Sequence, residues 1–189
     1  MNNTDYSVEE KKLMLSIARA TMEATLKKTE MPDRNELPGK LREIRSCFVT
    51  LHDKNSSLRG CIGNIGASEP LIDNIVHNAI NSAFRDPRFQ PVSSLEELAS
   101  LEVEISVLTL PEEIDSIDKF MPGEHGIILA NSGRSAVFLP QVAPEQGWSR
   151  EETLTHLSLK AGLYPYAWKE DNSKFSIFRA IVFSEKRIA

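Results

Sequence analysis

The sequence predicts an α+β fold in which a mostly antiparallel sheet is flanked by helices. Segments with helical spacing and segments with strand alternation are interspersed, without the regular strand–helix–strand rhythm of a parallel sheet. A short polar turn at residues 131–134 also joins two apolar runs directly, which is typical of a hairpin. A chain of 189 residues buries a sizeable core, so we expect one domain over residues 1–189, with room for a small second lobe.

The helices are predicted from their caps and apolar stripes. Residues 7–10 form a capping box, in which a serine hydroxyl and a glutamate carboxylate each accept from a backbone N–H. A second helix follows residues 68–70, carries a continuous apolar stripe, and ends before Asp86 and Pro87, because the residue before proline avoids helical angles. A short helix is expected at residues 95–99. A second capping box at residues 149–152 opens a helix that ends at Gly162.

The strands are predicted from alternation, β-branched residues and flanking turns. They fall at residues 47–51, 58–65, 101–107, 127–130, 135–139 and 175–183. If the first hairpin pairs by its shortest turn, Leu51 lies opposite Leu58 and Phe48 lies opposite Cys61. Cys47 and Cys61 then point to different faces of the sheet, so we expect no disulfide between them.

Composition narrows the function classes. The net charge of −5 and a pI near 5.5 argue against a nucleic-acid-binding protein, which normally carries a basic patch. No apolar run approaches the roughly 20 residues that span a bilayer, and the first residues lack the pattern of a secretory signal, so we expect a cytoplasmic protein without a membrane segment. With two cysteines, four histidines and no metal-binding spacing, the sequence indicates no metal or other cofactor.

The phrase LRGCIG at residues 58–63 is the most informative segment. Gly60 and Gly63 flank the thiol of Cys61, which leaves the sulfur uncrowded and allows a ligand to approach the backbone. Arg59 shares the strand face of Cys61 at roughly 7 Å, where a guanidinium favours the reactive thiolate. The alternatives are that Cys61 fills space in a packed strand and that Arg59 forms a surface ion pair.

Seven phrases in order resemble the AMMECR domain family, in the branch called AmmeMemoRadiSam system protein A. They lie at residues 58–63, 86–89, 104–108, 125–129, 138–142, 147–148 and 160–163, and the similarity runs from about residue 6 to 185. The resemblance implies a larger and a smaller lobe with a cleft between them, and an LRGCIG phrase that lines a functional surface. It also implies a shared pathway with Memo-like and radical SAM proteins as partners.

Four further residues are candidates for the site. His125, between two glycine-containing turns, is the candidate base for a cysteine nucleophile, or a turn histidine at a strand edge. Glu104 is a candidate acid or base, or part of the wet face of a half-buried strand. Arg88 is expected either to bind an anionic ligand through its guanidinium group or to brace a loop. Gln141 is expected to present its amide either to a cleft or to the backbone as a hydrogen-bond partner.

These residues predict a thiol-dependent enzyme. Cys61 acts as nucleophile or redox thiol, Arg59 favours the thiolate, and His125 and Glu104 are the other candidate catalytic residues. Gly60, Gly63, Arg88 and Gln141 are expected to contact the substrate, a small metabolite or modified nucleotide. The alternative is a non-catalytic adaptor that docks a protein partner through its LRGCIG face, with an inert sulfur.

Overall fold

The computed structural model describes residues 5–188 and divides the chain into two compact units. The first unit contains the chain up to Leu108 together with the segment from Ile181, and the second runs from Thr109 to Ala180. Each unit contains a four-stranded sheet and helices, which confirms the predicted α+β class. Within the described residues, the longest helices are too short or too polar to cross a bilayer.

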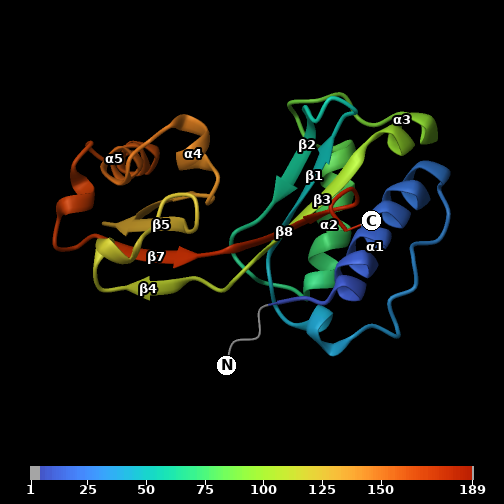
Figure 1. Cartoon of the computed structure of the whole chain (residues 1–189), viewed down its shortest axis with the longest axis horizontal. Helices are drawn as coiled ribbons and strands as arrows, with labels where there is room; N and C mark the ends of the chain where they lie inside the picture. The colour runs from blue at the N-terminus through green and yellow to red at the C-terminus, as the bar shows by residue number, and fades with distance from the viewer. Residues whose placement is uncertain (1–4, 189) are drawn as a thin grey trace. The chain divides into compact units, whose positions relative to one another are not determined.

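The first unit is a sheet of order β2-β1-β3-β8 that is packed on one face by two helices. In Figure 1, α1 and α2 lie beside each other and against the strands of this sheet. Its strands are β1 (Cys47–His52), β2 (Leu58–Gly63), β3 (Glu102–Leu108) and β8 (Ala180–Ser184); its helices are α1 (Val8–Lys27), α2 (Leu71–Phe84), α3 (Leu95–Ser100) and the 3-10 turn η1 (Gly39–Arg42).

Alternation places every second residue of the central strands in the core of this unit. Cys47, Val49 and Leu51 of β1 are fully buried beneath the helices, and Val103 and Ile105 of β3 are buried with them. The intervening residues point to the other face, as the period of two requires. The alternating burial of β3 confirms the prediction of a half-buried strand. The capping box predicted at residues 7–10 is also present, at the start of α1.

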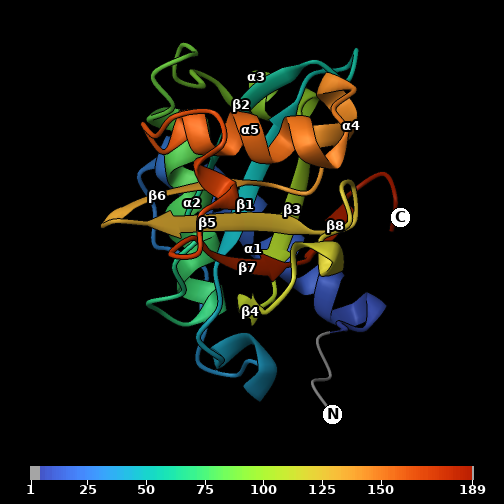
Figure 2. The same cartoon turned by 90° about the vertical axis from the view of Figure 1, so that its left-hand side faces the viewer.

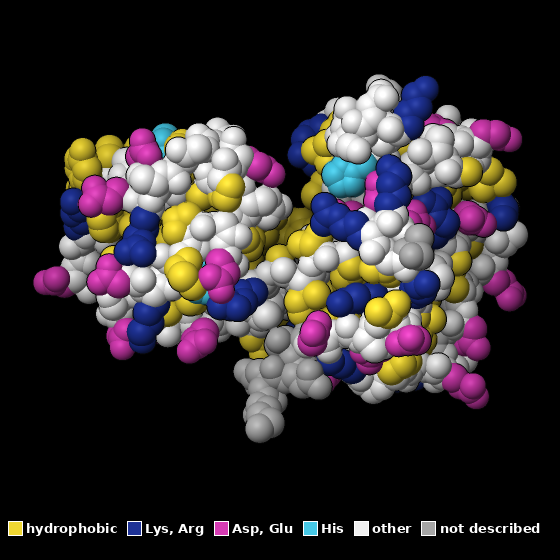
Figure 3. Space-filling view, in the orientation of Figure 1, with side chains coloured by type: hydrophobic (Ala, Val, Ile, Leu, Met, Phe, Trp, Pro, Cys, Tyr) yellow, Lys and Arg dark blue, Asp and Glu magenta, His cyan; other side chains and the backbone are white. Residues whose placement is uncertain are grey.

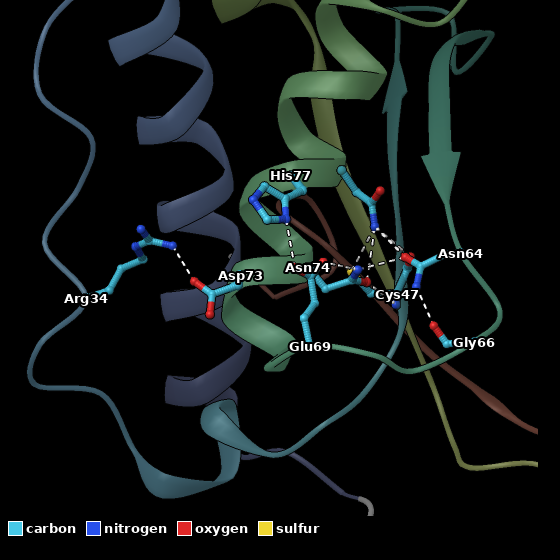
Figure 4. A network of polar contacts seen from close by, with 9 residues as sticks. Arg34, Cys47, Asn64, Gly66, Glu69, Asp73, Asn74 and His77 are labelled. Atoms are coloured by element: carbon cyan, nitrogen blue, oxygen red, sulfur yellow. Dashed lines mark hydrogen bonds and ion pairs between the residues drawn. The ribbon is translucent and has the colours of Figure 1, made fainter.

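Buried amides of α2 anchor the first residue of β1. The backbone N–H of Cys47 donates to Asn74 at 2.8 Å, and the Asn78 amide donates to the Cys47 carbonyl at 3.1 Å. Asn74 also donates to Asn64 at 2.7 Å, and Figure 4 shows Asn64 and Asn74 close to Cys47. Burial raises the pKa of the Cys47 thiol to about 12. Cys47 is therefore a core residue, held with its thiol protonated.

The second unit is a sheet of order β4-β7-β5-β6 covered by α5. Figure 2 shows α5 alongside β5, and Leu154 and Leu157 of the helix pack on Ile127 and Leu129 of the strand. Ser149 and Glu152 form the predicted capping box. The elements are β4 (Glu112–Ile114), β5 (Gly126–Asn131), β6 (Arg134–Phe138), β7 (Lys174–Phe178), α4 (Val142–Gln146), α5 (Arg150–Lys160), η2 (Ile117–Lys119) and η3 (Ala167–Lys169).

Two sequence predictions are wrong in detail. The apolar run at residues 175–183 is not one strand: β7 ends before Arg179, whose carbonyl accepts from the Thr109 N–H at 2.9 Å, and β8 belongs to the other sheet. The first hairpin pairs Thr50 with Cys61 and Leu51 with Gly60, two residues away from the expected register. The register also shifts between Leu51 and His52, so Arg59 falls between paired residues.

Candidate functional site

Cys61 lies on the face of the first sheet that is opposite to α1 and α2. We call this the polar face. It is formed by Phe48, Thr50 and His52 of β1, Cys61 and Gly63 of β2, and Glu102, Glu104 and Ser106 of β3. Because a register error of two residues preserves the side-chain face, the predicted separation of the two thiols is correct. Cys61 is partly exposed, whereas Cys47 is buried on the other face.

Asp86 and Arg88 bond to the outer backbone edge of Cys61. The Cys61 N–H donates to Asp86 Oδ2 at 2.9 Å, and Arg88 Nη2 donates to the Cys61 carbonyl at 2.9 Å. Arg88 also donates through Nε to Asp86 Oδ1, at 2.9 Å. Since β2 is an edge strand, these bonds satisfy polar groups that would otherwise be free to pair with another strand.

The Asp86 carboxyl is nearly fully buried and remains charged. Hydrogen bonds from Arg88 lower its pKa most, and the backbone N–H groups of Cys61 and Arg88 add to the effect. Burial acts in the opposite direction but is outweighed, so the pKa of Asp86 lies well below its usual range. Arg88 keeps about half of its side chain exposed. It both braces the loop and retains an exposed guanidinium surface next to the Cys61 backbone.

Thr50 contacts the sulfur directly. Because both backbone groups of Cys61 point away from β1, Thr50 and Cys61 form a non-hydrogen-bonded pair, in which side chains approach more closely. The Thr50 hydroxyl donates to Cys61 Sγ at 3.3 Å. The hydroxyl thus places a hydrogen-bond donor beside the sulfur on the polar face.

Glu104 completes a row across three strands. It lies opposite Thr50 on the side away from Cys61, about two strand spacings, roughly 10 Å, from the cysteine backbone. Its carboxylate is 3.7 Å from His52 Nε2 and 3.9 Å from Arg187 Nη1. Figure 3 shows basic and acidic side chains interspersed over the first unit in that view.

Arg59 and Gly60 both make contacts within the first unit. Arg59 Nη2 bonds to Glu97 Oε1 of α3 at 2.6 Å, which is the ion pair that the sequence left open as the alternative to a role beside the Cys61 thiol. Gly60 faces α2 rather than the polar face, because any Cβ there would lie 2.2 Å from the Ser82 carbonyl oxygen. Its glycine is required by helix packing rather than by ligand approach.

Gly63 does share the face of Cys61, but its open side is filled from within the chain. A Cβ at this position would lie 2.3 Å from the ring of Phe48, its cross-strand partner. The aromatic ring therefore covers the glycine, and the space that the missing side chain leaves is not free for a ligand.

His125 and Gln141 belong to the second unit, whereas Cys61 belongs to the first. His125 is buried before β5, and its Nδ1 accepts from the Met121 N–H at 3.2 Å, which closes a local turn. Glu124 and Arg179 lie on the other side of its ring. Gln141 is exposed at the first turn of α4 and makes no capping bond. The surroundings of His125 fit the alternative of a turn histidine, whereas no bond from the Gln141 amide to backbone is present among the described residues.

Comparison with known proteins decides the family. The sequence profile of the AMMECR1 family matches residues 15–183. The chain belongs to the AMMECR1 family. Protein MK0488 of Methanopyrus kandleri is 36% identical over 187 residues, covering 95% of this chain and 90% of the relative. A Methanococcoides burtonii protein is 41% identical over 167 residues, covering 86% and 82%.

A solved relative has the same fold. The crystal structure of protein PH0010 from Pyrococcus horikoshii is similar with a TM-score of 0.80 and 38% identity, covering 95% of this chain and 93% of that chain. The AMMECR1 resemblance and the α+β class predicted from the sequence are therefore both confirmed. In this AMMECR1 protein, two of the phrases that carried the resemblance bond directly: residues 86–89 hold the backbone of residues 58–63.

Sequence reasoning missed Thr50 and His52 as members of this AMMECR1 site. Thr50 was one residue of a predicted strand, and His52 lay just outside that strand and was not a candidate residue. A signal for both existed, since residues 48, 50 and 52 alternate with the apolar residues of β1 and so share a face. The correct register of β2 was needed to place Cys61 beside them.

Proposed function

We propose that the polar face of the first sheet is the active site of a thiol-dependent enzyme in which Cys61 is the nucleophile. The contact of the Thr50 hydroxyl with Cys61 Sγ at 3.3 Å carries the proposal. Cys61 is partly exposed, its backbone is held on the outer side by Asp86 and Arg88, and its sulfur accepts from the Thr50 hydroxyl. Cys47, by contrast, is fully buried on the helix-covered face, where burial raises the pKa of its thiol.

The substrate class that fits this surface is a small anionic metabolite or modified nucleotide with an electrophilic carbon. The exposed part of the Arg88 guanidinium would bind a carboxylate or phosphate beside the sulfur. The thiolate would add to a carbonyl carbon, so that a sulfur–carbon bond forms and the π electron pair moves to oxygen. The proton released by the thiol then returns to that oxygen.

The pathway suggested by the AmmeMemoRadiSam branch gives this enzyme its proposed partners. A Memo-like and a radical SAM protein would act in the same reaction sequence, in the cytoplasm. The rival function is a docking module that binds a protein through the LRGCIG face. The two glycines give this docking function little support, because Ser82 and Phe48 of the same chain already occupy the space beside Gly60 and Gly63.

Genetic complementation tests the proposal. A strain that lacks the gene is complemented with the wild type, with Cys61→Ala or with Cys47→Ala, and its metabolites are profiled without preselection. We expect Cys47→Ala to restore the wild-type profile and Cys61→Ala to leave the profile of the deletion. A Cys61→Ala strain with the wild-type profile would refute thiol catalysis, and would favour docking if partner capture persists.

A further inference from the structure

His52 is the histidine that shares the polar face with Cys61. It is the last residue of β1, opposite Glu102 and one step diagonally from Glu104. Its Nε2 lies 3.7 Å from Glu104 Oε1, which fixes the direction of the side chain. Because Thr50 is opposite both Glu104 and Cys61, His52 is also a diagonal neighbour of Cys61.

The carboxylate of Glu104 lies at ion-pair distance from one ring nitrogen of His52. An acceptor next to Nε2 favours the form that carries its proton on Nε2 and its lone pair on Nδ1. Nδ1 is buried and has no hydrogen-bond partner within residues 5–188. A buried polar atom without a partner is rare in native proteins and calls for an explanation.

The spacing allows the unpartnered Nδ1 to serve the thiol. Diagonal neighbours on one face of an antiparallel pair have Cβ atoms about 7–8 Å apart, within the combined reach of an imidazole and a thiol. The histidine predicted as base, His125, lacks this freedom, because its Nδ1 already accepts from the Met121 N–H.

We infer that His52 is the proton acceptor for Cys61, and that Glu104 is the positioning residue that orients it. This rests on the proposed function. The proton leaves Sγ for His52 Nδ1, which gives a thiolate and an imidazolium whose Nε2–H faces Glu104. When the sulfur adds to the substrate carbon, the imidazolium returns the proton to the substrate oxygen.

Several charged groups surround this pair and set its pH response. The acidic groups on β3 are Glu102 and Glu104. The basic groups are Lys186 and Arg187, which follow β8, and Arg59 on β2. Asp86 and Arg88, which follow α2, form an ion pair with each other. Arg187 is 3.9 Å from Glu104 but well exposed, so solvent screens its competition with His52.

The test is the pH dependence of Cys61 alkylation by iodoacetamide in the full chain, followed by peptide mass spectrometry. We expect His52→Gln to slow alkylation at pH 7 about tenfold and to move the half-maximal rate to higher pH. Glu104→Gln should move it in the same direction by less. His77→Gln is the matched control, since His77 is exposed on α2 and contacts Glu69, so the rate should not change.

His52→Gln with the wild-type rate and pH profile would overturn the inference and leave the proposed function intact. A slower rate in His125→Gln but not in His52→Gln would overturn it too and restore the original candidate base. Native wild-type Cys61 that reacts more slowly than the unfolded chain would instead refute the proposed function.

A second measurement does not depend on the folding of His52→Gln. The His52 ring protons are titrated by NMR in the wild type and in Cys61→Ser. We expect the wild-type curve to show a second inflection from the thiol that is absent in Cys61→Ser. Identical curves in the two proteins would show that the groups do not interact, and would overturn the inference.

Discussion

Replacing Gly60 by alanine tests why β2 carries a glycine next to Cys61. The added Cβ would lie 2.2 Å from the Ser82 carbonyl oxygen and 3.2 Å from its carbonyl carbon. Both are backbone atoms of α2, so no side-chain rotation relieves the clash. The helix would have to move by about 1 Å, and α2 also anchors β1 through Asn74 and Asn78.

We expect Gly60→Ala to lower the free energy of unfolding by about 2 kcal/mol, the typical effect of overpacking a core. For a chain of this size, that corresponds to a fall in Tm of roughly 4–8 °C, measured by calorimetry. Gly66→Ala is the matched control, because a Cβ there meets nothing within 4 Å. Its change should stay within about 0.5 kcal/mol.

Gly60→Ala that melts at the wild-type temperature would refute this account of the β2–α2 contact. An equal loss in Gly66→Ala would contradict it as well, because an added Cβ meets nothing there and the loss in Gly60→Ala could then not be assigned to the clash with Ser82.

Three other outcomes follow from the site. Asp86→Asn should cost about 2 kcal/mol at pH 7 by leaving Cys61 and Arg88 poorly paired. Because the folded-state pKa of Asp86 is depressed, the stability advantage of the wild type is complete above about pH 4 and declines as the pH falls toward the folded-state pKa. Urea denaturation should therefore show the stabilities of the two proteins converging in acid. A difference that stays constant with pH would contradict the role of the charged Asp86 in holding Cys61 and Arg88. Thr50→Val should keep the strand but slow Cys61 alkylation at pH 7, and an unchanged rate would rule out the hydroxyl contact. Cys47, whose pKa burial raises to about 12, should be alkylated only in denaturant, and rapid native labelling would contradict its burial.

Local signals predicted the elements of the fold well. Capping boxes at Ser7 and Ser149 opened helices where expected, because the cap depends on residues only three apart. The alternation of β3 correctly predicted its buried and partly exposed faces. The strand at residues 175–183 failed because its apolar pattern continues through Arg179, and only the long-range contact with Thr109 interrupts the pairing.

The site depends more on distant contacts, and sequence reasoning was correspondingly weaker. The placement of Cys47 and Cys61 on opposite faces of the sheet was predicted correctly, because a pairing error of two residues leaves every side chain on its own face. The ion-pair partner of Arg59 could not be predicted, since the register irregularity at Leu51 and the position of Glu97 on α3 are invisible in a local pattern. Glu104 proved to share the face of Cys61, which its alternation alone left open.

The rate of Cys61 alkylation at pH 7, compared between the native chain and the same chain unfolded in urea, tests the central claim most directly. Unfolding normally accelerates alkylation, because a folded protein restricts access to its thiols. We predict the reverse, with native Cys61 reacting faster than the unfolded thiol, because the contact of the Thr50 hydroxyl with Sγ exists only in the folded sheet. A native rate below the unfolded rate would contradict the assignment of Cys61 as a nucleophile.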